Sequence, residues 1–276
     1  MFQKISHKNI IICLILLLIL ILYFVYRNKT NNVAENKTKK NIVFLTYGDK
    51  NFKKSRERII NEAKQLDLFT DCIMETENIF NEREFKKLLT NKRFKQVAHS
   101  KRGGGYWIWK PYILYKHLSN LNEGDILVYS DAGCQITDDI NTVNSFNDIF
   151  HKIQNTDTNM LLNELPNQRT ERYWTKGDVL DYYNIYDNND IINSAQLESG
   201  RVFLIKNDKT MEIISKWWDV AKNHPELFDD SKSVVPNKGE FIEHRHDQSN
   251  ISILCKLNEC CDGTDLEFIK RGFSRE

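Results

Sequence analysis

A single carboxylate after a strand-like run is the first residue whose type and position favour chemistry. Residues 125–130 are the clearest strand-like run of the chain, and they lead through Ser130 into Asp131, Ala132 and Gly133, which places a carboxylate at the carboxyl end of the strand. A carboxylate at a strand end is able to hold Mg²⁺ or Mn²⁺ between two phosphates, so that the metal stabilises a departing diphosphate. Aspartate also initiates turns, so Asp131 alone is a moderate signal.

A second segment, residues 103–112, combines three glycines with aromatic side chains and one cation. Gly105 permits close approach of the backbone, Trp109 offers stacking surface, and Lys110 supplies a positive charge. This combination indicates a binding segment for a nucleotide diphosphate. The alternative is a glycine-rich loop ahead of a helix, with Trp107 and Trp109 buried in the core.

Residues 173–178 are polar and aromatic and stand just before a predicted helix. Trp174, Lys176 and Asp178 in this arrangement indicate a loop that contacts a sugar. An equally good interpretation is that Thr175 or Asp178 simply caps the helix.

A dense polar cluster, residues 243–249, precedes the last apolar helix of the chain. His244, His246 and Asp247 lie within four positions, together with Arg245, and are side chains that bind metals or phosphates or transfer protons. One such residue would be unremarkable, but the group favours a site. Asp247 is the candidate for a base or for a carboxylate that orients a sugar.

The elements that must position these side chains alternate between strands and helices, which predicts an α/β domain with a largely parallel or mixed sheet and helices on both faces. In such domains ligands bind at the carboxyl edge of the sheet, where Asp131 is expected. The predicted strands are 42–46, 72–74, 125–130, 160–162 and 201–205, and the predicted helices are 52–68, 84–89, 113–121, 178–186, 208–223 and 247–257.

The N-terminal region predicts a membrane anchor. Residues 10–26 contain no charged side chain and are at the short end of the roughly 17–25 residues that a spanning helix needs. No small residues at a cleavage site follow them, which argues against a cleaved signal peptide. We therefore expect a tail at 1–9, a transmembrane helix at 10–26, a polar stem at 27–40 and one catalytic domain at 41–276.

Composition excludes other classes of partner and site. The 39 basic and 38 acidic residues nearly balance, so no global field would recruit nucleic acid. The six cysteines show no paired metal spacing, and neither a disulfide framework nor a zinc site is indicated.

In the order of these segments the chain resembles glycosyltransferases of the GT-A fold, such as those of bacterial capsule clusters and large DNA viruses. The resemblance implies a Rossmann-like mixed sheet and a donor site at Asp131, with Gly133 in place of the second aspartate of the family's acidic motif. Mn²⁺ or Mg²⁺ is the implied cofactor, and Asp131, His244 and His246 are its expected ligands.

The same resemblance assigns further donor contacts. Lys110 is similar to the basic residue that meets the diphosphate, and the stretch His246-Asp247-Gln248 is similar to a late motif that closes over donor and acceptor. The remaining expected contacts are the nucleoside-binding turn Thr46, Tyr47 and Gly48, and the donor-sugar contacts Ser199 and Gly200.

The implied activity is transfer of a hexose-type sugar from a nucleotide sugar to an acceptor hydroxyl of a glycan, protein or lipid, with Lys110, Asp131 and Asp247 as catalytic residues. The alternatives are a membrane-tethered carbohydrate-binding protein without activity and a metal-dependent phosphodiesterase. We expect a single-pass membrane protein: basic residues after the anchor favour a cytoplasmic catalytic domain, whereas the order of tail, anchor, stem and domain is that of lumenal Golgi- or ER-type transferases.

Overall fold

The computed structural model describes residues 19–23, 40–137, 139, 141–166, 168–260 and 266–270. It divides the chain into two units, Met1–Lys40 and Asn41–Glu276. Residues 19–23 are helical, and the rest of the predicted anchor and most of the predicted stem lie outside the described residues. In the part of the chain that is described, no helix combines the length and the apolar character that crossing a membrane requires.

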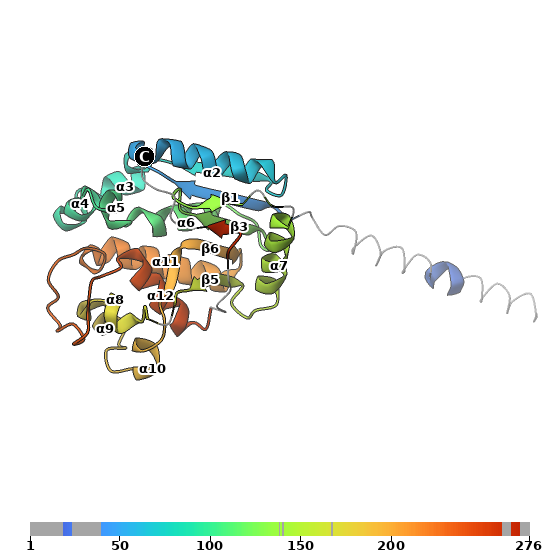
Figure 1. The fold of residues 1–276 in the computed structure, drawn as a ribbon. Coiled ribbons are helices and arrows are strands. Elements are labelled where there is room, and N and C mark those ends of the chain that lie inside the picture. The colour runs from blue at the N-terminus through green and yellow to red at the C-terminus, as the bar shows by residue number, and fades with distance from the viewer. Residues whose placement is uncertain are drawn as a thin grey trace, which may run out of the picture. The chain divides into compact units, whose positions relative to one another are not determined.

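Within the described residues the second unit is built on a five-stranded sheet of order β2-β1-β3-β6-β5 (Figure 1). Strand β1 (Ile42–Tyr47) is parallel to β2 (Asp71–Glu75) and to β3 (Ile126–Ser130). Strand β6 (Leu197–Ile205) is antiparallel to both β3 and β5 (Met160–Glu164). The mixed α/β sheet expected from the sequence is confirmed.

Side chains alternate between the two faces of this sheet and form two apolar clusters. Phe44 packs with α2 (Lys53–Gln65) and α7 (Thr142–Gln154) on one face. Leu45 packs on the other face with the cluster that contains side chains of α6 (Trp109–Ser119), α11 (Asp208–Asn223) and α12 (Asp247–Leu257). Helices therefore cover both faces, as predicted.

The remaining described elements are short and lie mostly in the connections. They are η1 (Lys50–Phe52), η2 (Glu77–Asn81), α3 (Arg83–Leu88), α4 (Lys92–Ala98), α5 (Gly103–Tyr106), β4 (Gln135–Ile136), α8 (Glu171–Trp174), α9 (Gly177–Tyr182), α10 (Asn189–Ile192), η3 (Pro225–Leu227) and β7 (Ile269–Lys270), which pairs with β4.

Two elements, α6 and β6, begin four residues earlier than the sequence predicts. Helix α6 begins at Trp109 rather than 113, because Pro111 falls in its first turn, where backbone N–H groups need no helical partner. Strand β6 begins at Leu197 rather than 201, so Ser199 and Gly200 lie inside a strand. Their polar composition does not resemble a strand, but all nine residues of β6 are buried.

Side chains tie β1 and β3 together at both ends. At the start, the carboxylate of Asp125 accepts hydrogen bonds from the backbone of Asn41 and Asn122 at 2.8 and 3.0 Å. Burial alone would raise the pKa of Asp125, but these bonds hold it below its ordinary value. At the carboxyl ends, the hydroxyl of Thr46 donates to the carbonyl of Ser130 at 2.7 Å. The residues that follow the two strands are thereby held at one edge of the sheet.

Candidate functional site

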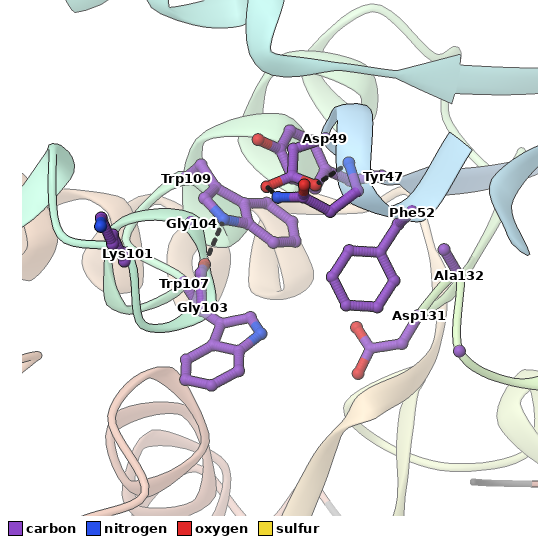
Figure 2. Close-up of a pocket in the computed structure, with 13 residues that line it drawn as sticks. Tyr47, Asp49, Phe52, Lys101, Gly103, Gly104, Trp107, Trp109, Asp131 and Ala132 are labelled. Atoms are coloured by element: carbon purple, nitrogen blue, oxygen red, sulfur yellow. Dashed lines mark hydrogen bonds between the residues drawn. The ribbon is translucent and has the colours of Figure 1, made fainter. Parts of the chain in front are cut away.

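A pocket of about 400 Å³ opens at the carboxyl ends of β1 and β3 (Figure 2). Three segments line it: the turn after β1, the glycine-rich segment before α6, and the turn after β3. The lining residues are Tyr47, Gly48, Asp49, Asn51, Phe52, Lys101, Gly103, Gly104, Trp107, Trp109, Asp131, Ala132 and Gly133. The pocket thus lies at the sheet edge that the sequence indicated.

Aromatic rings form much of the pocket wall. Trp109 stacks on Tyr47 with ring centroids 3.6 Å apart, and its indole N–H donates to the carbonyl of Gly103 at 3.1 Å. Figure 2 shows Trp107 and Phe52 on opposite sides of the opening. Flat apolar walls with a few polar groups are typical of sites that bind a planar ring such as a nucleobase.

The hydroxyl of Tyr47 is buried and has no hydrogen-bond partner among the described residues. Burial is the main cause that raises the pKa of Tyr47 above its ordinary value, and the nearby carboxylate of Asp49 raises it further. The hydroxyl therefore keeps its proton at neutral pH. A buried polar group without a partner is unfavourable unless a ligand or water completes it. Tyr47 therefore offers a hydrogen bond to an occupant of the pocket.

The glycine-rich segment forms a left-handed turn, with positive φ at the five successive residues Gly103 to Trp107. A side-chain carbon at Gly103 would lie 2.3 Å from the ring of Trp107, and one at Gly105 would lie 2.5 Å from the carbonyl oxygen of Ala98. Only glycine fits these two positions. The turn brings the rings of Trp107 and Trp109 to the pocket.

A buried lysine joins two carboxylates beside the pocket. The ammonium of Lys110, 1% exposed, lies 3.0 Å from Oδ1 of Asp131 and 3.0 Å from Oδ2 of Asp247. Burial alone would lower the pKa of Lys110, but the two carboxylates raise it above its ordinary value. The lysine is therefore a fixed cation at neutral pH.

Asp131 is the member of this group that reaches the pocket. Its side chain is 35% exposed, and its Oδ1 also accepts a hydrogen bond from the hydroxyl of Tyr129 at 2.6 Å. Its Oδ2 has no hydrogen-bond partner in the described part of the chain, and Figure 2 shows the carboxylate pointing into the opening. One oxygen is fixed by donors, and the other is available to a ligand.

Asp247 lies behind Lys110 and is not among the residues that line the pocket. Its Oδ2 accepts a hydrogen bond from the hydroxyl of Ser199 at 2.6 Å. The backbone N–H of Asp131 donates to the carbonyl of Gly200 at 2.8 Å. The structure therefore brings Lys110, Asp131, Asp247, Ser199 and Gly200 together, although they come from four separate segments.

The structure does not bring the two predicted histidine ligands to Asp131. Nε2 of His244 contacts the carbonyl of Leu227 at 2.9 Å, and Nε2 of His246 contacts Asp230 at 3.0 Å. Across the described ranges no group of three or more His, Cys, Asp or Glu side chains is arranged to hold a metal. The three-ligand metal centre expected from the sequence is therefore not assembled there, and Asp131 is its one member at the pocket.

The residues of the predicted sugar-contact loop make packing contacts outside the pocket. Lys176 is buried, and its ammonium donates to the carbonyl of Glu226 and lies 3.5 Å from Asp229. The carboxylate of Asp178 accepts two backbone hydrogen bonds, each of 2.8 Å, from the segment that follows η3. Trp174 is covered by the guanidinium of Arg245, 4.4 Å from the ring centroid. These contacts hold the chain between η3 and α12, and none of the three predicted residues lines the pocket.

Four other predicted residues support the site from outside the pocket. Thr46 and Ser130 are buried at the strand ends, Gly105 packs against α4, and Gln248 donates to the side chain of Gln196 at 2.8 Å. The predicted residues that do line the pocket are Tyr47, Gly48, Trp109, Asp131 and Gly133.

Sequence reasoning missed several pocket residues. Asp49 and Phe52 follow Gly48 in the turn after β1, and Lys101 precedes the three glycines. Their nearness to two segments already singled out was the available signal. Trp107 was considered either as stacking surface or as a core residue, and the structure shows it half-buried and lining the pocket.

No protein-family model matches the sequence, and no curated protein matches it. Solved structures similar to this chain include glycosyltransferases. One, involved in glycosylating the major capsid of the virus PBCV-1, is 13% identical with a TM-score of 0.36, over 74% of this chain and 81% of that one.

Mouse xyloside xylosyltransferase 1 is 8% identical with a TM-score of 0.42, over 82% of this chain and 85% of that one. Core-mannan synthase A from Aspergillus fumigatus, in a Mn/GDP form, is 9% identical with a TM-score of 0.40, over 80% and 70%. At these values the similarities assign no activity to the chain.

Proposed function

We propose that residues 41–276 form a glycosyltransferase that binds a nucleotide-sugar donor in the pocket at the carboxyl edge of β1 and β3. The observation that supports this most strongly is that one pocket combines an aromatic wall, containing Trp107 and Trp109, with an exposed carboxylate oxygen of Asp131. Lys110 and Tyr129 hold the carboxylate of Asp131 in place. The wall provides stacking for a base, and the charged group lies where a diphosphate would follow. The resemblance in motif order to GT-A enzymes supports the same conclusion.

In the proposed reaction an acceptor hydroxyl attacks the anomeric carbon, a new C–O bond forms, and the bond from that carbon to the diphosphate oxygen breaks. The hydroxyl gives up its proton, and the nucleoside diphosphate departs. Lys101, which lines the pocket, contributes positive charge on the side of the leaving group, and the buried Lys110 offsets part of the negative charge of Asp131. Asp247 fixes Lys110 and thereby orients Asp131.

A divalent cation belongs to this proposal. The free Oδ2 of Asp131 is a hard oxygen ligand, and Mg²⁺ is commonly held by one or two carboxylates together with substrate phosphates and water. Such a cation would neutralise charge on the diphosphate. A hexose-type sugar and a glycan, protein or lipid acceptor complete the proposal.

The direct test begins with binding. We expect UDP or GDP to quench the tryptophan fluorescence of residues 41–276, because Trp107 and Trp109 line the pocket, and we expect Mn²⁺ to tighten the binding. A panel of nucleotide sugars is then screened for release of nucleoside diphosphate. Binding without release or transfer for any donor and acceptor would favour the carbohydrate-binding alternative, and absence of nucleotide binding would refute the proposal.

We also propose that residues 10–26 anchor the protein in a membrane, on the basis of their uncharged apolar sequence. The full chain is expected to sediment with membranes and to be released by detergent but not by high salt, whereas residues 41–276 remain in the supernatant. Release of the full chain by salt or carbonate alone would contradict the anchor. Protease protection in sealed vesicles would then determine the side on which the domain lies.

A further inference from the structure

His246 has a backbone conformation that is costly for a side chain other than glycine. Its φ is 56° and its ψ is −118°, immediately before the first residue of α12. Strain of this kind persists only where surrounding contacts enforce it, and it is concentrated at functional sites. The contacts of the imidazole ring show what enforces it here.

The ring of His246 packs against the left-handed turn that forms the pocket wall. It stacks on Tyr106 with centroids 5.2 Å apart and planes 20° apart, and it lies 5.3 Å from the ring of Trp107. Tyr106 and Trp107 themselves have positive φ, at 52° and 56°. Two strained segments, far apart in the sequence, therefore hold each other in place.

Polar contacts fasten the same junction. Nε2 of His246 lies 3.0 Å from Asp230, and Asp230 is also paired with the guanidinium of Arg102 at 3.0 Å. Arg102 directly precedes the left-handed turn and also contacts Glu243 at 3.3 Å. Burial lowers the pKa of His246, while Asp230 and Asp247 oppose that shift and Arg102 reinforces it.

The residue after His246 belongs to the group of ion-paired side chains formed by Asp247, Lys110 and Asp131. Asp247 pairs with Lys110, and Lys110 pairs with Asp131 at the pocket. A displacement of the backbone at His246 would move Asp247 in the same direction, because the two are adjacent. His246 thus stands between the aromatic wall and the charged group.

We propose that His246 is a positioning residue, which couples the wall at Trp107 to the Asp247–Lys110–Asp131 group through its stacked ring and its strained backbone. As far as catalysis is concerned, this inference rests on the proposed function, but the coupling itself is a property of the fold. When the ring is removed, the contacts that hold this backbone conformation against the turn are lost, the turn at 103–107 loosens, and Asp247 shifts away from Lys110.

Two variants separate the ring from the backbone. His246→Ala and His246→Gly both lack the ring, but glycine adopts the observed φ and ψ without strain. We expect His246→Gly to melt at a higher temperature than His246→Ala, which reverses the usual order of the two residues. His224→Ala is the matched control, because it removes a 43%-exposed imidazole outside the pocket.

Hydrogen exchange measures the coupling without any ligand. In both His246 variants the amides of residues 101–110 are expected to exchange about tenfold faster or more, while those of β1 keep their wild-type rates and His224→Ala changes neither. Wild-type exchange at 101–110 in both variants would overturn the proposal. This readout stands even if the wild-type protein binds no nucleotide, in which case the proposed function alone fails.

Kinetics supply the second readout. Where wild-type turnover is found, His246→Gly is expected to lower kcat on the order of 100-fold at saturating donor, while its melting temperature stays near that of the wild type. A merely structural role would lower the melting temperature and spare kcat in the folded fraction. Wild-type kcat in folded His246→Gly would likewise overturn the proposal.

Discussion

Replacement of Lys110 by methionine is expected to destabilise the folded domain by about 3–5 kcal/mol and to abolish transfer. Methionine approximates the length of the lysine stem but leaves Asp131 and Asp247 without the ammonium that lies 3.0 Å from each. Because the pKa of Lys110 is raised in the fold, the pairing contributes fully below the unfolded value near 10.5 and is lost as pH rises through the folded value. Urea unfolding at neutral pH and in alkali measures both effects.

Lys116 provides the matched control for this variant. It lies on the same helix and also contacts two carboxylates, Glu75 at 2.8 Å and Glu82 at 2.6 Å, but its side chain is 28% exposed. Lys116→Met is expected to cost about 1 kcal/mol or less and to leave transfer unchanged. The double variant with Lys110→Met and Asp247→Asn should recover part of the lost stability. If Lys110→Met and Lys116→Met had equal effects on stability and transfer, that result would contradict a special role for Lys110.

Replacement of Asp131 by asparagine is expected to reduce transfer on the order of 100-fold or more while the domain stays folded. The amide oxygen of the asparagine can still accept hydrogen bonds from Tyr129 and Lys110 in place of the carboxylate oxygen, so the local geometry is preserved. The negative charge that faces the pocket is lost, and with it the proposed ligand for a cation. Donor turnover with and without Mn²⁺, together with a melting curve, measures the two expectations separately.

Asp187→Asn is the control for the Asp131 variant, because its carboxylate is 93% exposed and lies outside the pocket. It should retain wild-type turnover and stability. Turnover by purified Asp131→Asn at the wild-type rate would show that the pocket carboxylate takes no part in the reaction.

The sheet was largely predictable because its local signals agree with its tertiary environment. The apolar run that begins at Ile42 is buried in β1, and Ile59, Ile60 and Ala63 form the buried stripe of α2 at helical spacing. The start of β6 was not predictable, because Ser199 and Gly200 have no strand preference. The carbonyl of Gly200 accepts a hydrogen bond from the backbone N–H of Asp131, and β6 packs against α12, so tertiary contacts decide the conformation of this part of the strand.

The candidate site was predictable in its segments but not in its contacts. Asp131 and Lys110 were singled out by composition, yet nothing local shows that one ammonium contacts both Asp131 and Asp247. The density of polar side chains around His246 likewise does not reveal whether an imidazole nitrogen faces a metal ion or Asp230. Such outcomes depend on how distant segments meet in the fold.

The turn from Gly103 to Trp107 reverses the handedness that L-amino acids impose on a chain. Over these five residues the backbone approximates the mirror image of an ordinary helical turn, and it returns to the normal hand at Ile108, just before α6 begins. Achiral glycine is indifferent to this inversion, but Tyr106 and Trp107 oppose it. The pocket wall therefore has a left-handed backbone that tertiary contacts must maintain. If the domain loses those contacts, the wall is expected to lose its shape as well.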